Sequence, residues 1–215
     1  MHLSPERSLG LAQCEDLEIL GPLDVPRLSI LSLRFKRGDK DLHYGFVVSL
    51  LNDLFGIQAR GGCSCAGPYG HSLLGMDMSY SRALQSQIAA GNAILRPGWV
   101  RLNFNYFISE AEFDYLLGAI ELVAKHGWRL LPCYRFDMTS GVWRFHSEAR
   151  SLPVTLGGLS FDRLEPTGRA TPSPWELRDL LVEAERELTS TRPKTPETIR
   201  NLPDETERLR WFALP

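Results

Sequence analysis

The residues with the clearest chemical potential lie in one short segment, residues 56–71 (GIQARGGCSCAGPYGH). It holds Cys63 and Cys65, together with Arg60, His71 and five glycines. Glycine lets the backbone adopt positive φ angles and approach a ligand closely, and an arginine beside a thiol favours the reactive thiolate. The segment is therefore a candidate site for thiol chemistry. The alternative is a tight turn in which both cysteines pack as small apolar side chains.

A metal site is a second interpretation of this segment, with Cys63, Cys65 and His71 as ligands. The Cys-x-Cys spacing is shorter than the gap typical of structural zinc sites, and Cys14 and Cys133 are far away in the sequence. We therefore expect no metal. A thiol or metal carrier stays as the third hypothesis for the function.

Arg101 is the other candidate binding residue. It lies in an alternating pattern, Trp99-Val100-Arg101-Leu102-Asn103-Phe104, that is typical of a strand with one buried face. A guanidinium on such a strand either reaches solvent or meets an acceptor, and its planar donors match a carboxylate best. His43 and His71 are solitary histidines beside a turn or a helix start. We expect them to be surface or packing residues rather than bases.

Composition limits the classes of partner and compartment. The chain has 215 residues with 24 basic and 26 acidic side chains, and its net charge of −2 is unlike that of nucleic-acid-binding proteins. No apolar run is long enough to span a membrane, and the first residues lack the apolar core of a signal peptide. Four irregularly spaced cysteines do not form a disulfide framework. We therefore expect a soluble, cytoplasmic protein that binds neither nucleic acid nor membrane.

Periodicity predicts strands and helices in alternation. The strongest signal is a helix over residues 109–127, where Ser109 and Glu112 form a capping box ahead of an apolar stripe. The remaining elements are helices at 43–55, 79–90 and 174–190, strands at 28–35, 57–59 and 99–104, a hairpin at 134–136 and 142–145, and further short strands within 152–161. Residues 36–40 are predicted to be a solvated turn.

A change in composition suggests two regions. Nine of the fourteen prolines lie at or beyond Pro132, and we place a boundary near residue 148. Residues 1–147 are predicted to form one small domain, and residues 148–215 a Pro-rich extension with one clear helix. No glycine fingerprint for phosphate precedes a helix, which argues against a doubly wound parallel sheet. The predicted fold is α+β, with a small, mainly antiparallel sheet covered by helices.

Two of these motifs carry a family resemblance. Residues 60–66 (RGGCSCA) resemble the Arg-x-Gly-x-x-Cys-Ala pattern in the C-terminal domain of class V aminotransferase-like enzymes, which include cysteine desulfurases and selenocysteine lyases. Residues 99–106 (WVRLNFNY), followed by Ser109-Glu110 and a helix, resemble that family's strand with its substrate-carboxylate arginine. The order and spacing of the two motifs are also similar to the family's. The resemblance covers residues 18–147.

The resemblance implies the small domain of a fold-type I enzyme that depends on pyridoxal phosphate and acts on an amino acid. Arg101 would bind the substrate carboxylate, Arg60 would help to shape the same pocket, and Cys65 would occupy the place of the desulfurase nucleophile. In a desulfurase this thiolate takes sulfur from substrate cysteine and leaves alanine and an enzyme persulfide, with the cofactor as electron sink. Cys63 has no counterpart, and many relatives of desulfurases lack this thiol chemistry.

The chain departs from the family in one important respect. The family's large domain supplies the lysine that holds the cofactor, well upstream of the cysteine loop, and none of the four lysines here (Lys36, Lys40, Lys125 and Lys194) matches it. The chain therefore resembles the C-terminal third of such an enzyme, inactive alone, and we expect self-association or a large-domain partner. The alternative is a non-catalytic protein-interaction module that keeps the small-domain fold.

Overall fold

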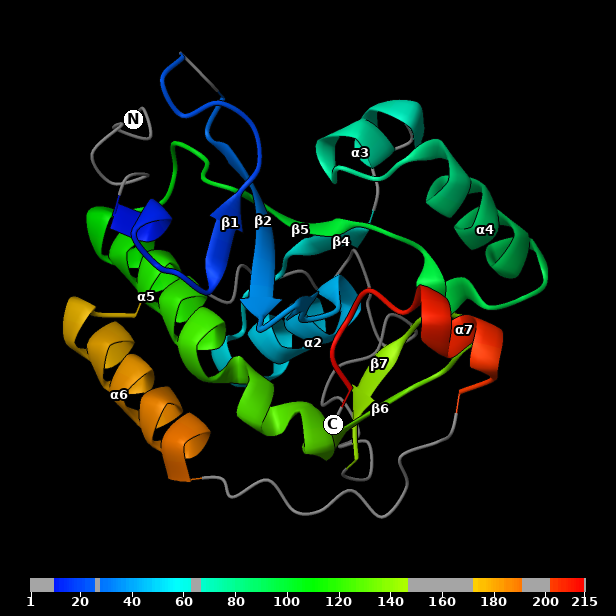
Figure 1. Ribbon diagram of the computed structural model, residues 1–215. Helices are drawn as coiled ribbons and strands as arrows, with labels where there is room; N and C mark the ends of the chain where they lie inside the picture. The colour runs from blue at the N-terminus through cyan, green and yellow to red at the C-terminus, as the bar shows by residue number, and fades with distance from the viewer. Residues whose placement is uncertain (1–9, 26–27, 63–66, 147–171, 191–201, 215) are drawn as a thin grey trace, which may run out of the picture.

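The computed structural model describes residues 10–25, 28–62, 67–146, 172–190 and 202–214 (Figure 1). Its larger sheet has the order β1–β2–β5–β4, and β3 pairs with the end of β2. These pairs are all antiparallel. The strands are β1 (Leu17–Ile19), β2 (Ile30–Arg37), β3 (Lys40–Asp41), β4 (Arg60–Gly62) and β5 (Trp99–Asn103).

Alternation along β2 gives the sheet one apolar and one polar face. Leu31, Leu33 and Phe35 are almost fully buried, and the residues between them are polar. Leu102 and Val100 of β5 lie opposite Leu31 and Leu33 and continue the apolar face. The other face carries the polar side chains of Ser32, Arg34 and Lys36. One face of the sheet therefore packs in the core, and the other presents polar groups.

Helices cover the apolar face (Figure 1). They are α2 (Tyr44–Phe55) and α5 (Glu110–His126), and α6 (Pro174–Ser190) packs on the far side of α5. Three buried side chains, Leu177, Ala184 and Leu188, attach α6 to the core. This packing confirms the α+β class and the mainly antiparallel sheet covered by helices.

The remaining elements surround this sheet. They are α3 (Gly67–Leu73), α4 (Met78–Ala89), α7 (Asp204–Leu209), the 3₁₀ helices η1 (Ala93–Leu95) and η2 (Gly127–Cys133), and a hairpin of β6 (Tyr134–Phe136) and β7 (Trp143–Phe145). After α7 the chain returns to the larger sheet, where Phe212 forms a parallel bridge with Asp41. Within the described ranges no helix combines the length and the hydropathy that crossing a membrane requires.

Several local predictions are confirmed. The Ser109–Glu112 capping box is present at the start of α5, and α6 begins at Pro174. Gly56 ends α2 in the left-handed conformation with φ of 66°. The predicted hairpin forms from β6 and β7. Each of these signals is local, so the neighbouring residues alone are sufficient to specify it.

Other predictions need correction. The strand expected at 57–59 forms three residues later, as β4. The chain from Gly67 onward is helical although its glycines and Pro68 suggested a turn. Lys36 lies within β2, which ends at Arg37, and not in the solvated turn predicted for residues 36–40. The strands expected within 152–161 and the boundary near residue 148 lie outside the described residues. Phe212 and Leu188, beyond that boundary, pack in the same core as the first region.

Candidate functional site

The sheet brings two of the predicted site residues together. Arg60 of β4 is in register with Arg101 of β5. Directly opposed residues in an antiparallel pair lie on the same face, with Cβ atoms about 5 Å apart. Arg60 is exposed and Arg101 is half-buried. Arg60 and Arg101, which the sequence places 41 positions apart, therefore form one cationic pair.

Ser32 extends this pair into a row. It is in register with Arg101 from the β2 side, so Ser32, Arg101 and Arg60 cross three strands on the polar face. Neither guanidinium donates a hydrogen bond or forms an ion pair to any other described residue. Like charges placed directly opposite each other on a sheet are destabilising. An anion bound at this row would therefore reduce the repulsion between the two guanidinium groups.

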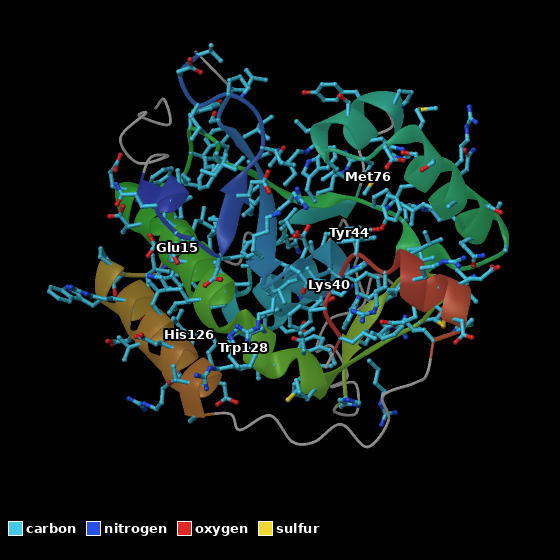
Figure 2. The ribbon with its side chains drawn as sticks, viewed as in Figure 1. Glu15, Lys40, Tyr44, Met76, His126 and Trp128 are labelled. Atoms are coloured by element: carbon cyan, nitrogen blue, oxygen red, sulfur yellow. The ribbon has the colours of Figure 1, made fainter. Side chains whose placement is uncertain are left out.

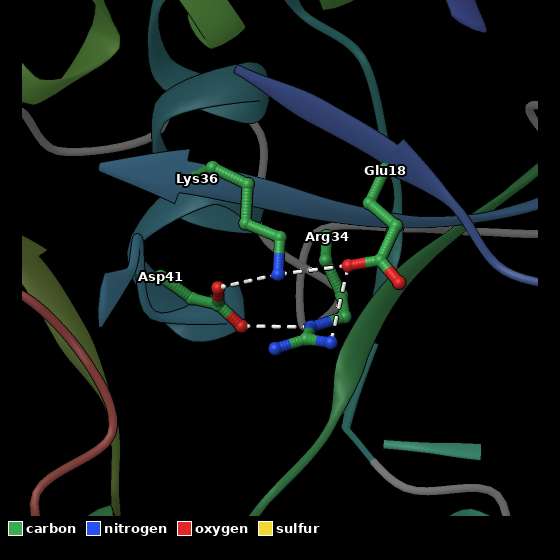
Figure 3. Close-up of polar contacts among 4 residues, drawn as sticks. All are labelled: Glu18, Arg34, Lys36 and Asp41. Atoms are coloured by element: carbon green, nitrogen blue, oxygen red, sulfur yellow. Dashed lines mark hydrogen bonds and ion pairs between the residues drawn. The ribbon is translucent and has the colours of Figure 1, made fainter. Parts of the chain in front are cut away.

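Four neighbouring charges on the same face are, by contrast, fully paired (Figure 3). Arg34 Nε donates to Asp41 Oδ2 at 2.8 Å, and its Nη1 donates to Glu18 Oε2 at 3.1 Å. Lys36 Nζ lies 2.7 Å from Glu18 Oε2 and 3.3 Å from Asp41 Oδ1. Each cation contacts both anions, so the quartet neutralises itself. Its role is to join β1, β2 and β3, and it leaves no charge free for a ligand.

The described lysines do not fit the role of holding pyridoxal phosphate. Lys36 is part of the quartet, and Lys40 Nζ donates to the Arg210 carbonyl at 2.8 Å, beside the C-terminal segment (Figure 2). Lys125 is exposed in the last turn of α5 and lies 3.8 Å from Glu121. Lys194 lies outside the described residues.

Cys63 and Cys65 also lie outside the described residues. Cys65 follows Gly62 of β4 by three positions in the sequence. Its assignment as nucleophile therefore stays a prediction. Cys14 and Cys133 are half-buried and are not in a disulfide.

Gly61 shows which contact the glycines of β4 serve. A Cβ atom at this position would lie 2.7 Å from Tyr44 Cδ2 and 3.1 Å from Val48 Cγ2, both on α2. No real Cβ tolerates the first distance, so only glycine lets the Tyr44 ring approach this strand. The close approach that the sequence suggested for a ligand is thus made by a helix. The sequence analysis did not identify Tyr44. The glycine at position 61, next to Arg60, was the feature that could have indicated a close neighbour there.

His43 is a packing residue, as predicted. It is fully buried, its Nδ1 accepts a hydrogen bond from the Gly45 amide at 3.0 Å, and its Nε2 donates to the Ile94 carbonyl at 3.1 Å. The ring therefore caps α2 in its neutral form. Desolvation lowers the pKa of His43 to about 3, although the hydrogen bond to Ile94 acts in the opposite direction.

Among the described residues, the His71 side chain contacts Ser81, with Nδ1 2.7 Å from Ser81 Oγ. This contact joins the end of α3 to the first turns of α4. Among the described residues no cluster of three His, Cys, Asp or Glu side chains has the arrangement of a metal site. His71 therefore connects two helices here.

Comparison with models of protein families, with curated proteins and with solved structures finds no match to this chain.

Proposed function

We propose that this chain is the C-terminal part of a pyridoxal-phosphate-dependent enzyme of the class V aminotransferase and cysteine desulfurase type, and that the Arg60–Arg101 pair binds the carboxylate of its amino-acid substrate. One observation carries the proposal: both arginines of the two family-like motifs lie side by side on one face and lack partners among the described residues. A carboxylate would neutralise this repulsion and accept paired hydrogen bonds.

The two arginines would contribute unequally. Arg101 is half-buried, so its charge is less screened and its hydrogen bonds are stronger than those of the exposed Arg60. The Ser32 hydroxyl, on the other side of Arg101, can supply a further donor. We therefore assign the main carboxylate contact to Arg101 and a supporting role to Arg60.

The cofactor would come from elsewhere. Because the described lysines do not fit the role of holding pyridoxal phosphate, that lysine would belong to a large domain outside this sequence. The exposed rings of Tyr106 and Phe107, which lie shortly after β5 with centroids 4.0 Å apart and tilted by 33°, are suited to contact such a domain. Persulfide chemistry at Cys65 would require a reducing compartment, so we propose a cytoplasmic location.

Titration with L-alanine tests the carboxylate site. The side-chain Nε–H resonances of the full chain are followed by NMR, and we expect a saturable response with a dissociation constant on the order of millimolar. The Arg101→Ala variant should weaken binding by at least about tenfold, the loss expected for a charge-assisted hydrogen-bonded pair. L-Alaninamide, which lacks the carboxylate, should give no response.

The chain offers a matched control. Arg135 and Arg144 form another in-register arginine pair, on the β6–β7 hairpin, and both are exposed. The Arg144→Ala variant should bind L-alanine like the wild type. A wild type that does not respond, or an Arg101→Ala variant that responds equally, would refute the assignment.

Borohydride trapping tests the missing lysine. We expect that the isolated chain, mixed with one equivalent of pyridoxal phosphate and reduced, shows no stoichiometric lysine adduct in peptide mapping, because Lys36 and Lys40 are already engaged. A large-domain partner, once found, should acquire the adduct on its own lysine. A full adduct on Lys36, Lys40, Lys125 or Lys194 would contradict this account.

The second candidate is a non-catalytic interaction module. The engagement of Lys36 and Lys40 favours it, because these side chains serve the fold. On this hypothesis L-alanine gives no saturable response, and the Arg101→Ala and Cys65→Ser variants bind the partner protein as the wild type does.

A further inference from the structure

The C-terminal strap, residues 202–214, closes one edge of the larger sheet. The Asp41 amide donates to the Trp211 carbonyl at 3.2 Å, and the Ala213 amide donates to the Asp41 carbonyl at 2.8 Å. The strap thus runs parallel to β3 as an additional edge segment. Figure 1 shows it crossing from α7 over the start of α2.

Side chains fix the strap in place. Phe212 is fully buried, the Trp211 Nε1 donates to the Leu95 carbonyl at 3.0 Å, and the Tyr80 hydroxyl donates to the Leu209 carbonyl at 2.7 Å. These contacts join the strap to α4, η1 and the core. A segment with this many specific contacts is a defined part of the fold.

Trp211 connects the strap to the arginine row through one intermediate ring. It stacks on Tyr44, with centroids 6.1 Å apart and an interplanar angle of 16°. Tyr44, labelled near the strap in Figure 2, also contacts Gly61. Gly61 follows Arg60 directly in β4. The contacts therefore form a path from Trp211 to Tyr44, and from Tyr44 to the strand that bears Arg60.

β4 needs such support. It has three residues, two of them glycines, and pairs with β5 alone. Glycine weakens a strand because it has no side chain to pack, and a short edge strand is among the first parts of a sheet to open. The Tyr44 ring occupies the space that a side chain at position 61 would fill. Whatever holds this ring in place also holds β4.

We propose that the C-terminal strap is a positioning device for the arginine pair. Trp211 holds Tyr44 against Gly61, and this contact keeps β4, and with it Arg60, in register with Arg101. Trp211 and Tyr44 are thus positioning residues, which touch no ligand themselves. The effect on ligand binding rests on the proposed function, whereas the effect on β4 does not.

Two measurements on the Trp211→Ala variant test the proposal. Amide hydrogen exchange at residues 60–62 should become roughly tenfold faster, while exchange in the buried centre of β2 stays at the wild-type rate. Affinity for L-alanine should fall about fivefold to tenfold, the usual size of coupling between linked sites. Trp211→Phe keeps a flat ring and should restore both values.

Trp175→Ala is the matched control, because Trp175 on α6 is 70% exposed. It should change neither measurement. If Trp211→Ala does not fold, Trp211→Leu fills the space without a flat ring and takes its place. Unchanged exchange at 60–62, or equally faster exchange in β2, would overturn the proposal. A wild type that does not bind L-alanine would instead refute the proposed function, and the exchange measurement would still decide on the strap.

Discussion

Replacing Phe212 by alanine is expected to lower the free energy of unfolding by about 3–5 kcal/mol. The Phe212 ring is fully buried, and its edge-to-face contacts with His43 and Trp143 have centroid distances of 4.8 and 6.3 Å. Its removal leaves a cavity between the strap, α2 and β7. Urea unfolding followed by far-UV circular dichroism measures the loss.

A control variant separates this effect from a general response to mutation. Val182 on α6 is 52% exposed, and Val182→Ala should change the free energy of unfolding by no more than about 0.5 kcal/mol. A loss below about 1 kcal/mol for Phe212→Ala would mean that the strap contributes little to the fold.

The second large effect is a loss of stability at acidic pH, caused by the buried His43. The pKa of buried His43 is lowered to about 3, whereas the same side chain in the unfolded chain has its ordinary value of 6.5. Between these values the unfolded state binds a proton that the folded state does not. The contribution of His43 to stability is therefore complete above pH 6.5, and it decreases by about 1.4 kcal/mol for each pH unit as the pH falls toward 3.

Urea unfolding at pH 7 and at pH 5 measures this effect. Hydrogen bonds hold the pKa of Asp137 at about 2 and lower the pKa of Glu112, so these two carboxylates stay ionised in the folded protein over this interval. The His43→Asn variant keeps an N-cap acceptor for α2. This variant should be less stable at pH 7. The slope of its free energy of unfolding with pH should be smaller than in the wild type by the contribution of one titrating proton. An equal pH dependence in both proteins would contradict a neutral His43.

Helix termini were predictable because their signals lie within a few residues. The capping box of α5 and the Ser173-Pro174 start of α6 both fit the structure. β4 was predicted too early by three positions because the apolar pattern stops at Ala59, whereas the observed strand depends on Tyr44 approaching Gly61. That contact is tertiary, and periodicity does not report it.

The candidate site shows the same division. Residue type was sufficient to single out Arg60 and Arg101, and the family resemblance assigned them to one pocket wall. Only the register of β4 with β5 places them opposite each other. The pairing of Lys36 with Glu18 and Asp41 was missed because the ion quartet joins three strands. Cys65 stays a prediction.

The strap also has a consequence for how the protein is made. Lys40 and Arg210, which meet at the edge of the sheet, are 170 positions apart. On the ribosome, α2 emerges long before the residues that shield the His43 ring from water. Contacts between such distant residues form late, because a long loop must first close. The nascent chain therefore exposes the aromatic surface around His43 until Trp211 and Phe212 have been synthesised, and a chaperone would act on such a surface.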